Sequence, residues 1–245
     1  ANTHLYVPEL WYRLMNCGFF IPPVGGTDLP NYPQRDAWQP FLGEIRTYTN
    51  VDEENDFDAW KSAIKANRVF VTSGPMVSLR INDSGLGGRV SLPEAGGEIE
   101  INTTLSTPIG LTEMELLRNG QPVRAEIVKK KLGDVHLWRI KHKMNVTRSC
   151  WFAVRGKGVP IQSLDIPSLK KQSWSETSVI AHSAAIPVIV GGQEVRSRED
   201  RDWLVCHLAR QREFYETKAR YWNERQKERM LGYFDEATGK LRALK

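Results

Sequence analysis

The chain has 245 residues, of which 40% are hydrophobic and 26% charged, as in an ordinary globular protein. The formal net charge of +5 is modest and its basic residues are interleaved with acidic ones, so it does not favour nucleic-acid binding. All apolar runs are far shorter than the roughly 20 residues of a transmembrane helix, so no membrane span is expected. The three cysteines lack metal-site spacing and are predicted to be buried thiols that indicate no compartment.

The first region, about residues 1–75, alternates helix signals with strand signals. A helix is predicted over Pro8–Met15, because Pro and Glu suit a first turn and Gly18 follows the last one. A second helix is expected after Asn55 or Asp56, either of which can act as its N-cap. Short apolar runs predict strands at 19–21 and 69–72. Strand–helix–strand order of this kind is typical of an α/β layer or barrel.

The second region, about residues 76–195, is rich in short strand patterns. Several of them alternate apolar with polar side chains, as strands with one buried face do. Asn119-Gly120 lies between two of these runs and predicts a tight hairpin. Seven short strands in this region indicate an antiparallel β-sandwich. The predicted strands cover 76–82, 98–105, 113–118, 123–128, 135–142, 150–155 and 186–190.

The third region, about residues 196–245, has a helical pattern. Ser197 and Asp200 have the spacing of a capping box. One face is then apolar, and the opposite face is rich in Arg, Lys and Glu. We expect one long C-terminal helix that packs against its own protein, with a frayed tail beyond Gly232. The predicted apolar face consists of Leu204, Leu208, Tyr215, Ala219 and Trp222.

The first candidate for chemistry is the segment Gly25-Gly26-Thr27-Asp28. Functional side chains of α/β layers and barrels emerge where strands end, and a carboxylate there can bind a cation or accept a proton from water. The other interpretation of Asp28 is a turn or helix-capping residue, and the spacing alone does not decide between the two. The glycine pattern does not match a phosphate-binding loop or a dinucleotide fingerprint.

Several segments, in their order along the chain, resemble the carbaryl-hydrolase type (CehA/McbA) of PHP-like metallohydrolase. The similarity covers about residues 10–195, and its specificity comes from the order and spacing of the segments together. In the first region they are 14–19, 26–28, 43–48 and 60–75, the last two carrying Arg46-Thr47-Tyr48 and Arg68–Pro75. In the second region they are Leu117–Gly120, Cys150–Gly156 and Ala181–Val188.

The resemblance implies an α+β chain. Residues 1–75 would be the end of a PHP-type α/β barrel layer and residues 76–195 an antiparallel β-sandwich, while the helical pattern adds a long C-terminal helix and tail over residues 196–245. It also implies a metal-dependent hydrolase of ester, carbamate or phosphoester-type substrates. Such an enzyme binds divalent metal, zinc or manganese, through His-x-His and further His, Glu and Asp side chains, and Asp28 matches the late Asp of that metal centre.

The chain departs from this pattern in two places. It contains no His-x-His, and Asp28 is followed by Leu29-Pro30, where many PHP proteins have Asp-x-His. The chain is therefore expected to be the C-terminal portion of such an enzyme and to be inactive by itself, with no metal bound. Its expected partners are a small-molecule substrate and the missing N-terminal portion, supplied in the same chain or by a second chain.

Three further residues match the resembling segments. Arg46 and His182 are candidate catalytic residues, and Tyr48 is a candidate substrate-binding residue, since Arg and Tyr can orient a substrate oxygen or an anionic transition state. Alternatively, Arg46 pairs with Asp28 or the backbone and Tyr48 lines the wall. His182 either faces the mouth of the active site or is a hydrogen-bonded structural histidine.

A non-catalytic β-sandwich module that binds carbohydrate or protein is the alternative function. Its basis is the seven-strand pattern together with aromatic residues that could line a sugar-binding face. Packing in a core or interface is the other interpretation of those residues. They are Trp38, Trp138, Trp151 and Trp174.

Overall fold

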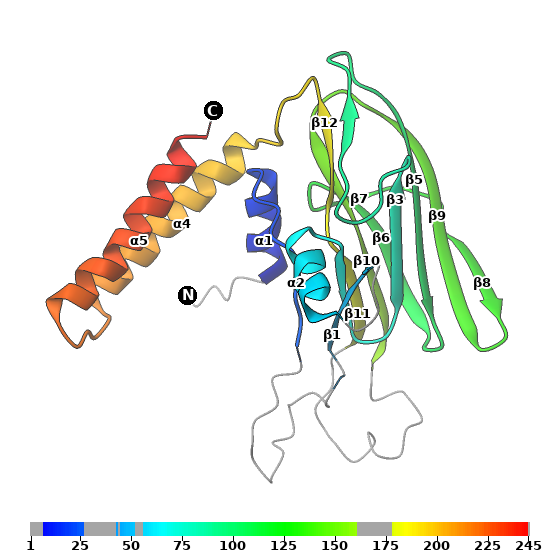
Figure 1. Cartoon of the computed structure of the whole chain (residues 1–245), viewed down its shortest axis with the longest axis horizontal. Helices are drawn as coiled ribbons and strands as arrows, with labels where there is room; N and C mark the ends of the chain where they lie inside the picture. The colour runs from blue at the N-terminus through cyan, green and yellow to red at the C-terminus, as the bar shows by residue number, and fades with distance from the viewer. Residues whose placement is uncertain (1–6, 27–42, 44, 52–55, 161–177, 245) are drawn as a thin grey trace, which may run out of the picture. The chain divides into compact units, whose positions relative to one another are not determined.

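The computed structural model describes residues 7–26, 43, 45–51, 56–160 and 178–244, and it confirms a mixed α+β chain with antiparallel sheets and a helical C-terminus (Figure 1). The chain divides into two compact units with boundaries that differ from the three regions above. Residues 1–20 and 194–245 form one, here called the helical unit, and residues 21–193 form the sandwich unit. In the part of the chain that is described, no helix is long and apolar enough to cross a bilayer.

The larger sheet of the sandwich unit, sheet A, is curled around the long strand β10. Its main path runs β1-β2-β11-β10-β12-β4, and β6 and β7 join through the other edge of β10. All of these pairs are antiparallel except β12 with β4. The strands are β1 (Arg46–Thr49), β2 (Val69–Thr72), β4 (Val90–Leu92), β6 (Leu111–Arg118), β7 (Gln121–Val123), β10 (Cys150–Pro160), β11 (Ser178–Ser183) and β12 (Ile186–Val190).

The second sheet, sheet B, is antiparallel with the order β3-β5-β9-β8. Its strands are β3 (Met76–Ile81), β5 (Gly97–Thr107), β8 (Val128–Leu132) and β9 (Val135–Val146). β3 alternates strictly between exposed and buried residues, as its sequence predicts, so one face of the sheet is buried. Side chains from both sheets form the core, among them Leu79, Ile101, Trp138, Leu116 and Phe152. The predicted sandwich is thus present as two packed sheets.

The strands of the first region belong to this sandwich. β1 and β2 flank the helix α2 (Phe57–Lys65) and pair antiparallel, and β2 pairs with β11. A βαβ unit of a barrel would instead place its strands parallel. Among the described residues, a separate PHP-type barrel layer is therefore not seen, because these strands complete sheet A.

Two local sequence signals specify their structure directly. Asp56 is the N-cap of α2, and its carboxylate accepts a hydrogen bond of 2.8 Å from the backbone N–H of Asp58. Asn119 and Gly120 both have positive φ, 51° and 82°, as a type I′ hairpin requires. They connect β6 to β7 at the predicted position.

Two strand predictions were wrong. Residues 19–21 form no strand, because the run is short and Pro22-Pro23 follow it without N–H groups to donate to a ladder. Residues 123–128 contain only the end of β7 and the start of β8. Between them Ala125 and Ile127 pack against the core from an irregular segment. The alternation of buried and exposed residues in this segment therefore arises from packing and not from strand pairing.

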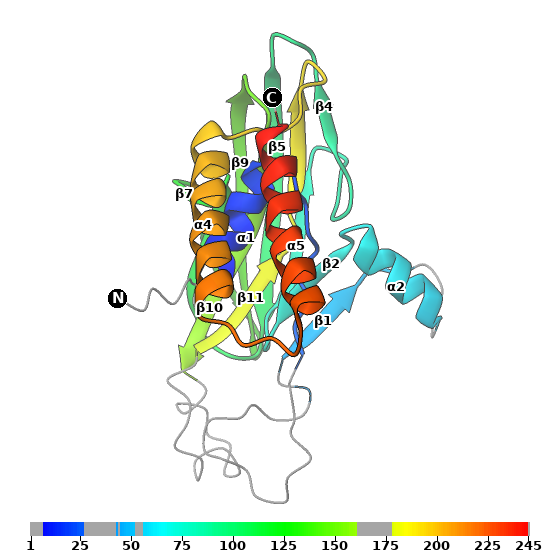
Figure 2. The same cartoon turned by 90° about the vertical axis from the view of Figure 1, so that its left-hand side faces the viewer.

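The helical unit contains α1 (Val7–Asn16), α4 (Arg198–Thr217) and α5 (Glu224–Arg242). α4 and α5 lie side by side as an antiparallel hairpin (Figure 2), joined by ion pairing of Arg212 with Asp235 at 2.8 Å. Arg13 of α1 pairs with Asp200 of α4 at 2.7 Å. The apolar centre of the unit combines residues from both ends of the chain, namely Cys17, Leu204 and Leu241.

The C-terminal region differs from its prediction in four respects. It forms two helices, and α5 remains helical to Arg242 because buried Leu241 packs in the apolar centre, so the expected fraying beyond Gly232 was wrong. Trp222 lies outside the apolar face and is 94% exposed between the helices. Cys206 is also exposed, whereas Cys17 and Cys150 are buried as predicted.

Candidate functional site

Asp28, the predicted metal ligand, lies outside the described residues, but the segment that leads to it is anchored. The hydroxyl of Thr47 accepts a hydrogen bond of 2.8 Å from the Gly25 N–H and donates one of 2.9 Å to the Gly25 carbonyl. A Cβ at Gly25 would stand 2.9 Å from the Ile45 side chain, closer than real Cβ atoms approach, so glycine suits this contact. The chain three residues before Asp28 is therefore held against β1.

Arg46 and Tyr48 lie on the other face of β1 from Thr47, because side chains alternate along a strand. The Tyr48 ring stacks on Phe70 with centroids 5.2 Å apart and is partly buried against the core. The Arg46 side chain is exposed and its guanidinium lies 5.8 Å from the centre of the Tyr48 ring. This placement fits the interpretation of Tyr48 as a wall residue better than direct contact with a substrate.

His182 lies in β11, on the same sheet face as Thr47. Its Nδ1 is 2.7 Å from the carbonyl oxygen of Ser183. A carbonyl only accepts, so Nδ1 carries the hydrogen and donates, which leaves Nε2 as the acceptor nitrogen of a neutral ring. Burial lowers the pKa of His182 to about 4, and the positive charge of Arg155 acts in the same direction, while the hydrogen bond to Ser183 opposes both. His182 is consequently neutral at neutral pH.

A row of cross-strand neighbours connects His182 to an ion pair. In the register of sheet A, His182 lies opposite Arg155 of β10, which lies opposite Glu115 of β6. Arg155 Nε donates a hydrogen bond of 2.8 Å to Glu115 Oε2. The Glu115 and Arg155 side chains are 17% and 34% exposed, so the pair is partly shielded from solvent. The Glu115 carboxylate thus holds the Arg155 guanidinium on the strand next to the neutral imidazole.

The same row continues in the other direction through Val71 of β2 to Thr47 of β1. Neighbouring strands are about 4.8 Å apart, so His182 and Thr47 are separated by about 10 Å across the sheet. The structure thus brings His182 and the segment leading to Asp28 to one face of sheet A. It places Arg46 and Tyr48 on the opposite face.

The described residues by themselves do not form a metal site. Among them, no three His, Cys, Asp or Glu side chains are grouped closely enough to hold a metal ion. Burial raises the pKa of the Cys17 thiol to about 11 and also raises that of Cys150, so neither supplies a thiolate near neutral pH. His182, with an acceptor Nε2 and a bonded Nδ1, has the form of histidine that metals bind.

Sequence reasoning missed Glu115 and Arg155 as members of this site. Arg155 lies in one of the resembling segments, but its partner could not be recognised without the register. The available signal was a charged residue in the apolar run Met114–Leu117, since a buried carboxylate in a strand requires a partner.

Glu115→Gln should lower the free energy of unfolding by about 1–3 kcal/mol, because it leaves the Arg155 charge partly buried without a carboxylate. Urea unfolding would measure the change. Glu98→Gln is the matched control, since Glu98 forms an exposed pair with Lys143 at 3.5 Å and exposed pairs contribute little. Equal effects of the two substitutions would contradict the role given to the Glu115–Arg155 pair.

The comparisons with known proteins give no family assignment for this arrangement. A scan against protein-family models found no matching family. A search of curated proteins found no match. The basis for a functional proposal is therefore the chemistry of His182, its neighbouring ion pair and the resembling segments.

Proposed function

We propose that this chain is the C-terminal portion of a metal-dependent hydrolase of the CehA/McbA type, acting on ester, carbamate or phosphoester-type substrates. The observation that carries the proposal is the neutral His182, whose Nδ1–H is bonded to the Ser183 carbonyl. The ordered segments that resemble the family support it. In this proposal, the PHP-type barrel layer is supplied by residues beyond this chain or by a second chain.

The roles of the residues follow from their chemistry. Asp28 is the proposed ligand of a divalent metal, zinc or manganese, and accepts a proton from water. The bound metal would supply Lewis-acid activation of water and substrate. His182 lies on the same sheet face as the Asp28 segment, and its ring is kept neutral mainly by burial, with a smaller contribution from Arg155.

Arg46 and Tyr48 have different roles in this proposal. Arg46 is exposed and can reach an anionic substrate group from the edge of the sheet. Tyr48 supports β1 through its stacking on Phe70. A substrate contact of the Tyr48 hydroxyl is a prediction from the resemblance alone.

The test compares this chain with a version extended by its upstream coding sequence, both loaded with zinc or manganese. We expect bound metal and aryl-ester hydrolysis only in the extended protein. Asp28→Asn should lower metal affinity or activity by about 100-fold, because the amide does not replace a carboxylate ligand. Asp56→Asn is the matched control, since Asp56 caps α2 and asparagine is an equally good cap.

Two results would contradict the proposal. Metal-dependent turnover by residues 1–245 alone would show that the chain is not an incomplete enzyme. Full activity of the extended Asp28→Asn protein would exclude Asp28 as a ligand. Absence of metal and activity from the extended protein would favour the second candidate function.

That second candidate is a β-sandwich module that binds carbohydrate or protein, and the two packed sheets with their common core support it. The tryptophans do not support the expected sugar-binding face, because Trp138 and Trp151 are buried, at 7% and 0% exposed. Trp38 and Trp174 lie outside the described residues. An exposed aromatic pair lies instead on α2, where Phe57 and Trp60 stack with centroids 5.7 Å apart.

A further inference from the structure

One hairpin of the sandwich unit has many basic residues and almost no acidic ones. Residues 128–146, here called the basic hairpin, comprise β8, β9 and the turn between them. They hold six basic residues and one acidic residue, a net charge of +5 that equals the formal charge of the whole chain. The remaining residues are therefore balanced between basic and acidic side chains. This balance is uneven along the chain, since residues 196–245 also carry a net charge of +4, so the hairpin is one of two basic stretches.

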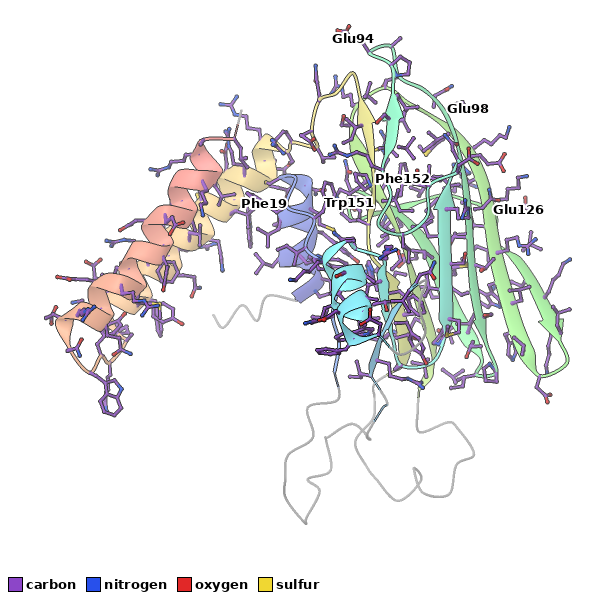
Figure 3. The ribbon with its side chains drawn as sticks, viewed as in Figure 1. Phe19, Glu94, Glu98, Glu126, Trp151 and Phe152 are labelled. Atoms are coloured by element: carbon purple, nitrogen blue, oxygen red, sulfur yellow. The ribbon has the colours of Figure 1, made fainter. Side chains whose placement is uncertain are left out.

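Among the described residues, the three lysines of β8 have no acidic partner. Within the described part of the chain, no ion pair joins Lys129, Lys130, Lys131 or Arg139 to a carboxylate. Lys141 and Lys143, farther from the tip, do pair with the β5 glutamates Glu98 and Glu100. Figure 3 shows Glu98 and Glu94 at the end of the sandwich away from the hairpin tip. The lysines of β8 are therefore not neutralised by the β5 glutamates.

Apolar side chains are exposed at the same tip. Leu132 and Val135 are paired across the turn and are 60% and 39% exposed. Val128, at the other end of β8, is 45% exposed. The turn itself consists of Gly133, which has a φ of 58°, and Asp134. Exposed apolar residues beside unpaired lysines have no evident role in the core of the sandwich.

The position of β8 limits which partner can occupy this surface. β8 is an edge strand of sheet B, and all five of its residues are exposed. Pairing with β8 of a second copy would bring the two lysine triplets together, which is unfavourable for like charges. A soluble polyanion would satisfy the lysines but leave Leu132 and Val135 in water. An anionic lipid surface offers negative headgroups to the lysines and an apolar interior to Leu132 and Val135.

We propose that the tip of the basic hairpin binds the surface of membranes that contain anionic phospholipids. Lys129, Lys130 and Lys131 lie close to the phosphate and carboxylate groups, and Leu132 and Val135 enter the boundary between headgroups and acyl chains. Lys129 also lies 3.8 Å from the centre of the Trp138 ring, which positions its stem along the hairpin. This binding is peripheral and is independent of the hydrolase proposed above.

The charge and the apolar tip contribute separately to binding. A lysine near an anionic membrane changes the partition coefficient by about fivefold, and the effect falls with salt because it is electrostatic. Lys130→Gln with Lys131→Gln should therefore weaken binding about 25-fold. Leu132→Ser with Val135→Ser should weaken it at least about tenfold through loss of buried apolar area.

The experiment measures co-sedimentation of the full chain with vesicles of phosphatidylcholine alone and with vesicles that also contain phosphatidylserine. We expect binding to the second kind only, weakened by salt and by each double variant. Lys65→Gln with Lys218→Gln is the matched control, since it removes two charges from exposed positions outside the hairpin and should leave binding unchanged. Thermal unfolding checks that all variants fold.

Three outcomes would overturn the proposal. The first is equal binding to both kinds of vesicle or to neither. The second is a control variant that weakens binding as much as the hairpin variants do. The third is tight binding to heparin or duplex DNA that displaces the vesicles and does not change in the Leu132→Ser, Val135→Ser protein, which would assign the surface to soluble polyanions.

Discussion

Phe152→Ala is expected to lower the free energy of unfolding of the sandwich unit by about 3–5 kcal/mol. Phe152 is fully buried in the common core. It lies on β10, opposite Arg118 of β6 on one side and Ile186 of β12 on the other, and Figure 3 labels it within the sandwich. Truncation removes apolar area from the strand around which sheet A curls and leaves a cavity that both sheets line.

Urea or thermal unfolding, followed by a signal of the sandwich unit, would measure this loss. Ile180→Ala is the matched control, because Ile180 lies on the neighbouring strand β11 and is 52% exposed. Its effect should be within about 0.5 kcal/mol, as for most surface substitutions. A Phe152→Ala protein as stable as this control would contradict the packing of the two sheets around Phe152.

The second large expected effect is that His182 lowers the stability of the folded chain as the pH falls. Its pKa is lowered from 6.5 to about 4 in the folded chain, so the unfolded chain binds more protons between these values. Stability from this residue is therefore fully present above pH 6.5 and is lost as the pH falls toward 4. Allowing for partial exposure of the ring, the loss is about 2 kcal/mol.

Histidine ring resonances followed by NMR would report the titration midpoint of His182 directly. Unfolding measurements across the same pH range would report the stability. In His182→Asn, whose amide N–H can replace the bond to the Ser183 carbonyl, the His182 contribution to the pH dependence should disappear. A midpoint near 6.5 would show that the ring is not held in its neutral form by burial and Arg155.

Local signals were sufficient for several elements of the fold. Asp56 specifies the start of α2, Asn119-Gly120 specifies a hairpin, and the alternation in residues 76–82 specifies β3. β1, β4 and β11 were not predicted, because each is short and is stabilised by partners distant in the sequence. Strand pairing of this kind depends on tertiary packing more than on local propensity.

The candidate site was predictable only in part for the same reason. The resemblance singled out His182 and Asp28 from their segments. It did not show that Glu115 and Arg155 form an ion pair beside His182, because three strands meet there through the register of sheet A. The strand–helix–strand pattern around α2 also does not show whether its strands are parallel or antiparallel. β1 and β2 are antiparallel, and β2 pairs with β11, so both strands belong to the sandwich.

The helical unit is assembled from the two ends of the sequence, with the sandwich unit inserted between them. On the ribosome, α1 is made long before Asp200 and Leu204 of α4, its partners in the folded unit. At 5–20 residues per second this interval lasts about 10–40 s, longer than a short isolated helix survives in water. The insertion therefore makes α1 dependent on α4 and α5, and a chain that ends before α4 would contain the sandwich unit but leave α1 without its partners.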